Sequence, residues 1–141
     1  MKYVLDSSVA FKWVVMEPWS DKARKLRDEF RQGLHEFHAP DIFPVEVAHS
    51  LTRAERQGRI SPRQAGISLA DVLLTCPNLH VYMPLLSRAV SISSQARIGV
   101  YDCLYVVLAQ REGCEFLTAD DRLIRTLQPS YPFITALSSL P

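Results

Sequence analysis

The sequence has 141 residues, a length that suits one folded domain with a sizeable hydrophobic core, and we expect residues 1–141 to form a single domain. Hydrophobic residues make up 48% of the chain and no apolar run reaches the ~18 residues of a membrane span, which excludes an integral membrane protein of the helical type. The formal net charge is only +1, so a nucleic-acid partner would have to bind a local basic surface.

The N-terminus and the cysteines indicate the cellular compartment. The first residues are apolar, but Asp6 and Lys12 interrupt them, which argues against a secretory signal peptide. Three cysteines are an odd number and show no CxxC spacing, so neither a disulfide framework nor a zinc knuckle is indicated. We therefore expect a cytoplasmic protein.

The N-terminal third alternates between strand and helix patterns. A short apolar strand at residues 3–5 ends at Asp6 and leads into a helix near residues 9–14. Ser20 stands where it can cap an amphipathic helix over residues 21–32. An extended piece around residues 37–39 follows.

The middle of the chain predicts a helical hairpin. Pro44 suits the first turn of a helix, and Glu46 falls in that turn. Ser61 and Gln64 form a start signal of the capping-box type for the next helix. The apolar face of this hairpin is either core or a docking surface for a partner. For the first helix, the residues expected on this face are Val45, Ala48, Leu51 and Ala54.

The second half of the sequence repeats the alternation. We expect strands at residues 79–83, 115–118 and 133–135 and helices at residues 84–96, about 101–112 and 122–127. Strands that alternate with helices are typical of a parallel sheet covered on both faces. The predicted fold class is therefore α/β: a three-layer α/β/α sandwich with a mostly parallel central sheet of four or five strands.

Four acidic residues occupy corresponding places in this predicted fold. Asp6 and Asp120 come just after strands, whereas Glu46 and Asp102 lie in the first turns of helices. Any one of them could simply favour a helix N-terminus, an effect of ~0.3 to 1 kcal/mol. The carboxyl ends of parallel strands, however, meet at one edge of a sheet, where ligands bind. Carboxylates gathered there repel one another, and a divalent cation offsets that repulsion, so the pattern predicts a metal site.

Four sequence motifs carry a resemblance to a known family. They are VLDSSV at the N-terminus, PVEVAHSL around Glu46, YDCLYVVLA around Asp102, and FLTADDRL around Asp120. In order and spacing the chain resembles the PIN domain nucleases and, among them, the VapC-like toxins of toxin and antitoxin pairs. The likeness covers essentially the whole chain, and four acidic motifs in the right order are far more specific than any one of them.

This resemblance implies a metal-dependent endoribonuclease that hydrolyses RNA phosphodiester bonds with one or two Mg²⁺ or Mn²⁺ ions. Asp6 and Asp102 match the principal metal ligands, and Asp120 and Glu46 complete the site directly or through water. A bound ion would lower the pKa of its water and stabilise the charge of the transition state. It would also reverse the sign of an acidic pocket that otherwise repels phosphate.

Supporting residues follow from the same likeness. Ser8 and Thr118 match positions that orient the carboxylates or a bound water by hydrogen bonding. A slip of one residue in the turn could present Asp121 in place of Asp120, and the alignment of the motif favours Asp120. As partners, the resemblance implies an RNA substrate, a homodimer and a cognate antitoxin, with no membrane.

Two other classes of protein share some of these features. A phosphoryl-accepting receiver or phosphatase domain also places acids at strand ends, but the chain has Ser8 where a DxD phosphatase needs a second aspartate. A catalytically silent binding module of the same fold is the second alternative, and four intact acids argue against it. The histidines near the second strand, His35 and His38, have no third ligand nearby in the sequence, and we expect them to be exposed loop residues.

Overall fold

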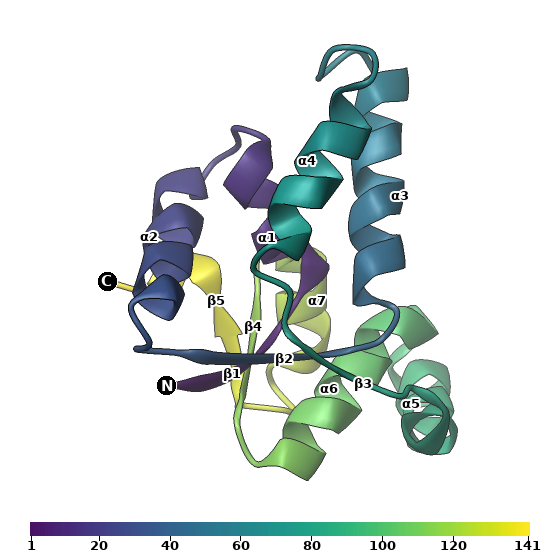
Figure 1. Ribbon diagram of the computed structural model, residues 1–141. Helices are drawn as coiled ribbons and strands as arrows, with labels where there is room; N and C mark the ends of the chain where they lie inside the picture. Colours follow the sequence, from purple (N-terminus) through teal and green to yellow (C-terminus); the bar gives the residue numbers. More distant parts are fainter.

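Five strands and seven α-helices alternate along the chain in a computed structural model that describes all 141 residues (Figure 1). The strands are β1 (Lys2–Leu5), β2 (Glu36–Pro40), β3 (Asn78–His80), β4 (Glu115–Thr118) and β5 (Ile134–Ala136). The helices are α1 (Ser7–Val14), α2 (Ser20–Arg31), α3 (Phe43–Arg56), α4 (Gln64–Leu73), α5 (Met83–Ala96), α6 (Val100–Glu112) and α7 (Asp121–Leu127). A short 3-10 turn, η1 (Leu137–Ser139), ends the chain.

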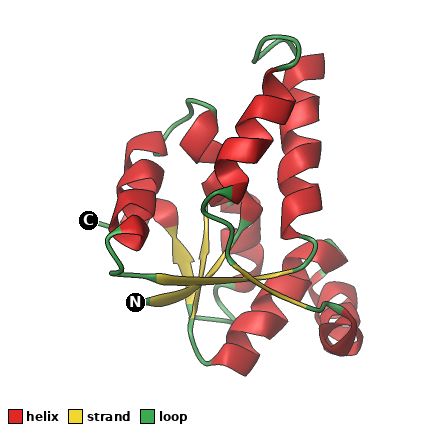
Figure 2. Cartoon of the chain, viewed as in Figure 1, coloured by secondary structure: helices red, strands yellow, loops and turns green.

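The strands form one sheet in the order β3-β2-β1-β4-β5, and every neighbouring pair is parallel. In Figure 2 the helices lie on both sides of this sheet, with α5 and α6 on one side and α1 and α2 on the other. The predicted α/β sandwich with a mostly parallel sheet of four or five strands is therefore confirmed. Because β1 is the central strand, its carboxyl end lies at the middle of the sheet edge.

Side chains alternate between the two faces of each strand, and β2 shows this clearly. Phe37 is buried and stacks on Phe30 of α2, with 4.6 Å between ring centroids, and also on Trp13 of α1 at 6.3 Å. The next residue, His38, is 7% exposed and points to the opposite face, which α6 covers. Strand β2 thus places an aromatic side chain in the core under α1 and α2, and a polar side chain on the other face of the sheet under α6.

Helix α6 is buried on all sides along its middle. Every residue from Cys103 to Ala109 is buried, because the helix lies between the sheet and α5. A helix packed on two sides needs apolar residues all round, which this stretch of α6 provides. No helix of the structure is long and apolar enough to cross a membrane.

Several local expectations were wrong. Val45 is 71% exposed and Val47 is buried, so the core-facing side of α3 is rotated from the predicted one, although Leu51 and Ala54 are buried as expected. Strand β3 stops at His80, because the following residues leave the sheet to begin α5.

The two predicted serine caps are also absent. Ser20 is the first residue of α2, and its hydroxyl accepts a hydrogen bond from Glu17 N at 2.9 Å. At α4, the carboxylate of Glu55 on α3 accepts from Ala65 N at 2.7 Å, so the neighbouring helix supplies the hydrogen bond that Ser61 was expected to provide.

Candidate active site

Asp6 lies at the centre of the sheet edge, directly after β1 and directly before α1. Its side chain is buried, with the residue 6% exposed. Oδ2 accepts hydrogen bonds from Ser8 Oγ at 2.6 Å and from Thr118 Oγ1 at 2.7 Å. Burial raises the pKa of Asp6 and the nearby charge of Asp120 raises it further, whereas the two hydroxyl donors lower this pKa. The carboxylate is therefore fixed in position but is not neutralised by a cation.

Ser8 and Thr118 join the ends of β1 and β4. Ala119 N donates to Ser8 Oγ at 3.1 Å, and Asp120 N donates to Thr118 Oγ1 at 3.1 Å. Each hydroxyl thus accepts from the turn after β4 and donates to Asp6. The sequence placed both residues in supporting roles, and the structure puts both in hydrogen-bond contact with Asp6.

Asp120 is the N-cap of α7, and its Oδ1 accepts from Leu123 N at 3.1 Å. Its negative charge raises the pKa of both Asp6 and Asp102, so it lies close to both. Asp121, the alternative fourth acid, is exposed in the first turn of α7 and takes part in no such interaction. The geometry therefore favours Asp120 as the residue that completes the acidic cluster.

The choice between these two acids can be tested by replacing each with asparagine. Asparagine caps a helix about as well as aspartate, so Asp120→Asn should keep α7 intact while removing the charge. We expect Asp120→Asn to weaken Mn²⁺ binding by at least about tenfold, a loss of ~1.4 kcal/mol, and Asp121→Asn to leave it unchanged. Calorimetric titration of each variant measures this, and the reverse order of effects would assign the role to Asp121.

Glu46 approaches the same place from the first turn of α3, near Asp6 and Asp102. Its Oε1 accepts a hydrogen bond from the Tyr105 hydroxyl at 2.6 Å. Burial raises the pKa of Glu46 to about 7; the bond from Tyr105 opposes this rise, and the charges of Asp6 and Asp102 add to it. The Tyr105 ring is fully buried in α6 and stacks on Phe116 of β4 at 5.5 Å, so it holds Glu46 from a rigid part of the core.

The Tyr105→Phe variant tests how much the hydrogen bond to Glu46 affects the pKa of this carboxyl and the stability of the protein. The change removes the only hydrogen bond given to the Glu46 side chain and leaves the ring packing unchanged, so the pKa of Glu46 should rise above about 7. We expect the protein to lose about 1 to 2 kcal/mol of stability, the usual cost of a buried polar group without its partner. NMR titration of the Glu46 carboxyl carbon, with thermal unfolding, would check both; an unchanged or lower pKa would show that the tyrosine does not stabilise the carboxylate.

Asp102 reaches the cluster from the first turn of α6. Burial, together with the charges of Asp6 and Asp120, raises the pKa of Asp102 to about 7, although the charge of Arg122 opposes this rise. No three of the four acids place carboxylate oxygens within 4.8 Å of one another, so their side chains have to move closer together for three of them to bind one ion. The charges of Asp6, Asp102 and Asp120 act on one another, and those of Asp6 and Asp102 act on Glu46, so the four acids gather at the same end of the sheet.

The acidic cluster, defined as Asp6, Glu46, Asp102 and Asp120, contains no ion pair. No lysine or arginine nitrogen lies within 4.0 Å of any of its carboxylates, and Arg122 acts on Asp102 only from a distance. Buried carboxylates without a cationic partner are costly, and proteins retain them where they coordinate metals or perform chemistry. Oxygen donors of this kind are the ligands that Mg²⁺ and Mn²⁺ prefer, so the residues present fit a hard divalent cation.

Two cavities adjoin the acidic cluster, one lined by Glu46 and the other by Asp120. The first has a volume of about 730 Å³, and its wall includes Glu46 together with the aromatic rings of Tyr82 and Tyr101. The second, of about 400 Å³, lies between Asp120 and a group of basic side chains. These basic residues are Lys12, Arg53 and Arg59. An extended ligand could therefore cross the cluster with an aromatic wall on one side and a basic wall on the other.

Sequence reasoning did not identify Tyr105 or the two cavities. No signal in the sequence shows that the Tyr105 hydroxyl meets a residue 59 positions away. The histidine expectation was wrong as well, since His38 is buried and neither it nor His35 is exposed. The partner of His38 is His80, which comes from another strand and could not be paired with it from the sequence.

Curated proteins named ribonuclease VapC are similar to this chain in sequence. The chain is 29% identical to ribonuclease VapC3 of Pyrobaculum aerophilum over 125 residues, which cover 87% of this chain and 92% of that protein. It is 34% identical to ribonuclease VapC3 of Mycobacterium tuberculosis over 88 residues, covering 62% and 63% of the two chains. Ribonuclease VapC12 of the same organism is 29% identical over 124 residues, covering 87% and 90%.

Solved structures show the same fold at lower sequence identity. The crystal structure of PAE2754 from Pyrobaculum aerophilum superposes with a TM-score of 0.71 at 17% identity, covering 99% of this chain and 94% of the other. The structure of VapBC2 from Rickettsia felis bound to a DNA fragment from their promoter gives a TM-score of 0.63 at 13% identity, covering 96% and 97%.

The family itself is shown by a sequence model that spans most of the chain. The model of the PIN domain matches residues 3–127, a range that begins in β1 and ends with α7. It therefore includes all four acids of the cluster and the two hydroxyl residues that hold Asp6. This protein belongs to the PIN domain family.

Proposed function

We propose that this protein is a metal-dependent endoribonuclease that hydrolyses RNA phosphodiester bonds, with Asp6, Glu46, Asp102 and Asp120 as its catalytic and metal-binding residues. The observation that carries the proposal is the convergence of these four acids at one sheet edge with no cationic side chain paired to them. The similarity to proteins named ribonuclease VapC supports RNA as the substrate.

The four acids would hold one or two Mg²⁺ or Mn²⁺ ions. When bound, such an ion supplies a water of lowered pKa as nucleophile and stabilises negative charge on the phosphate. Asp6 is the most rigid donor, because Ser8 and Thr118 fix one of its oxygens and leave the other free. Glu46 has one oxygen held by Tyr105, so its second oxygen can orient a water or accept its proton.

The two cavities suggest how RNA would pass over the acids. Bases of single-stranded RNA stack on aromatic rings, which Tyr82 and Tyr101 provide in the first cavity. Phosphates bind cationic side chains, and Arg53 in the second cavity has no carboxylate within 4.0 Å. Lys12 and Arg59 in the same cavity are both paired with Glu17, at 3.1 Å and 2.8 Å. Arg53 is thus the most available phosphate contact.

The same proposal includes a biological role as the toxin of a toxin and antitoxin pair, acting in the cytoplasm as a homodimer. The structural similarity to a VapBC assembly supports an antitoxin partner. Exposed apolar side chains on the α3–α4 hairpin offer a surface for such a partner, whereas other apolar residues of this hairpin are core. The exposed ones are Val45, Ile67, Leu73 and Leu74.

Cleavage of defined RNAs by the purified chain, free of any antitoxin, tests the proposal. A panel of structured and single-stranded RNAs would be incubated with Mg²⁺, with Mn²⁺, and with EDTA. We expect cleavage with either ion, none with EDTA, and recovery when excess Mn²⁺ is added back. Cleavage that continues in EDTA, or no cleavage of any RNA although the protein binds Mn²⁺, would contradict the proposed function.

A further inference from the structure

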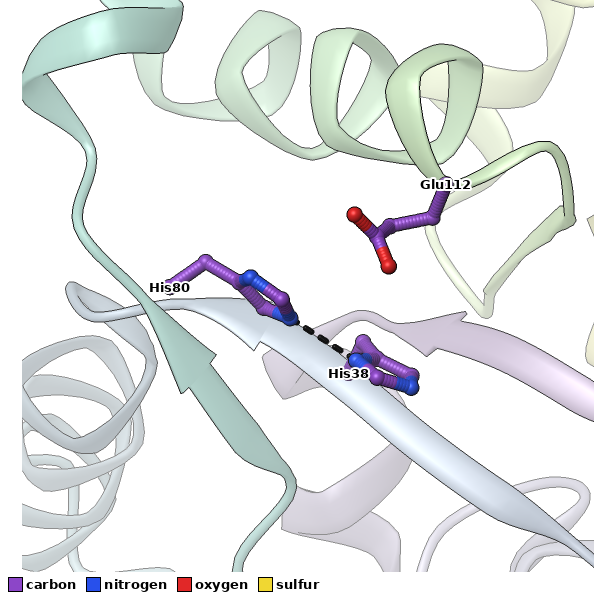
Figure 3. Close-up of side chains that lie close together, drawn as sticks. All are labelled: His38, His80 and Glu112. Atoms are coloured by element: carbon purple, nitrogen blue, oxygen red, sulfur yellow. Dashed lines mark hydrogen bonds between the residues drawn. The ribbon is translucent and has the colours of Figure 1, made fainter.

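A second group of metal-ligating side chains lies away from the acidic cluster. His38 of β2, His80 of β3 and Glu112 of α6 come from three different elements, and one ligand atom from each lies within 4.8 Å of the other two. Figure 3 shows the two imidazole rings side by side with the Glu112 carboxylate directed toward them. Glu112 is ten residues after Asp102 on the same helix, about 15 Å along its axis, so this group is separate from the acids.

The hydrogen bonds of the two histidines define where their protons are. Arg111 donates to His80 Nδ1 at 3.2 Å, which makes that nitrogen an acceptor and places the proton of His80 on Nε2. His80 Nε2 then donates to His38 Nδ1 at 2.8 Å, and His38 Nε2 donates to the Glu36 carboxylate. In this arrangement His38 Nδ1 presents a lone pair toward His80 and the space beside Glu112.

The arrangement around His38 is typical of a metal ligand. A histidine that binds a metal through one nitrogen usually donates its other N–H to a carboxylate, which fixes the ring and raises its basicity. Glu36 provides this contact, and His38 is 7% exposed, so the ring cannot turn freely. Two imidazoles and one carboxylate are also the protein ligands of a well-known type of zinc site, in which water takes the fourth position.

We propose that His38, His80 and Glu112 form a binding site for Zn²⁺ or a similar first-row transition-metal ion, separate from the acidic cluster. A tetrahedral ion about 2.1 Å from both ring nitrogens holds them about 3.4 Å apart, so the rings need to separate by only about 0.6 Å from their present 2.8 Å. The ion would join edge strand β3 to β2 and to the end of α6.

Metal binding replaces the hydrogen bond between His80 Nε2 and His38 Nδ1 and changes the contacts of Arg111 and Glu112, and the two rings keep the same number of protons. His80 must move its proton from Nε2 to Nδ1 when Nε2 takes the metal, and the exposed Arg111 side chain has to rotate away from Nδ1. The Glu112 carboxylate is paired through both oxygens, with Lys2 Nζ 3.1 Å from Oε1 and Arg111 Nε 3.6 Å from Oε2, so the metal has to displace a cation from it. The Lys2 ammonium group therefore competes with the metal for the Glu112 carboxylate, and mutation of Lys2 removes this competition.

Titration of the purified protein with Zn²⁺ alone, followed by calorimetry and by NMR of the histidine rings, tests the proposal. The ring signals of His38 and His80 should shift with one equivalent of bound ion, and the melting temperature should rise. His80→Gln should weaken this binding by at least about 100-fold, since even a supporting residue is worth 10- to 100-fold. His49→Gln, which changes an exposed histidine of α3, is the matched control and should bind like the wild type.

Lys2→Gln distinguishes a metal site from a merely structural cluster. If the lysine competes with the metal, this variant should bind Zn²⁺ about 2- to 5-fold more tightly, the usual worth of an exposed ion pair. A variant that only damages the fold would bind more weakly, so the two explanations differ in sign. None of these variants changes the acidic cluster, so Zn²⁺ binding at that cluster alone would be the same in all of them. Equal affinity in the wild type, His80→Gln and Lys2→Gln, with unmoved ring signals, would overturn the proposal.

Discussion

Replacing Asp6 by asparagine should reduce the rate of RNA cleavage on the order of 10³-fold, because loss of a group that stabilises transition-state charge costs about 3 to 4 kcal/mol. Asp6 is the residue around which the site is built, since it follows the central strand and receives hydrogen bonds from both Ser8 and Thr118. Asparagine has the same shape, and its amide oxygen can still accept from these hydroxyls. The fold should therefore persist while the charge is lost.

Single-turnover cleavage of an RNA from the panel measures this effect. Asp21→Asn is the matched control, because it removes an exposed aspartate from the first turn of α2, away from the sheet edge, and its rate should equal that of the wild type. Circular dichroism of both variants establishes that they are folded. An Asp6→Asn variant that cleaves RNA as fast as Asp21→Asn would show that the acidic cluster is not the catalytic site.

Asp102→Asn should make the metal-free protein more stable than the wild type above pH 7. The pKa of Asp102 is about 7 in the folded protein and 3.8 in the unfolded reference, because burial and two neighbouring carboxylates disfavour its charge. Between these values the folded state holds more protons, so the stability of the wild type falls as pH rises from about 4 to about 7. Above pH 7 the folded wild type bears the full free-energy cost of ionising the Asp102 carboxyl. The asparagine variant has no charge at this position and does not bear that cost.

The expected gain is about 2 to 4 kcal/mol at pH 8, since one pKa unit corresponds to about 1.4 kcal/mol, and it should vanish near pH 4. Urea unfolding of both proteins in EDTA at the two pH values measures it. Adding Mg²⁺ at pH 8 should stabilise the wild type and leave the variant unchanged. If Asp102→Asn destabilises the metal-free protein at pH 8, the carboxylate is already compensated within the protein and no cation is required.

The sequence was sufficient to predict the order of elements and the edge at which the acids meet. Hydrophobic periodicity identified every strand and helix of the structure, and the rule that parallel strands share a carboxyl edge brought Asp6 and Asp120 together. The positions of Glu46 and Asp102 followed from their places in the first turns of helices. Such predictions succeed because they depend on local patterns and on chain direction, both of which are present in one sequence.

Contacts between distant side chains could not be predicted in this way. The hydrogen bond from Tyr105 to Glu46 depends on how α3 and α6 are packed, and the cap that Glu55 gives to α4 depends on the hairpin geometry. The pairing of His38 with His80 depends on the register of β2 and β3. Each of these contacts joins elements whose relative placement is decided by the assembled core and not by either local sequence.

The central claim is that the acidic cluster binds a divalent cation, and equilibrium binding of Mn²⁺ tests it most directly. Electron paramagnetic resonance reports free Mn²⁺, so binding to the wild type and to Asp6→Asn can be compared without any RNA. We expect the wild type to bind one or two ions and Asp6→Asn to bind at least about tenfold more weakly, a loss of ~1.4 kcal/mol. Equal binding by the two proteins, or none by the wild type, would contradict the claim.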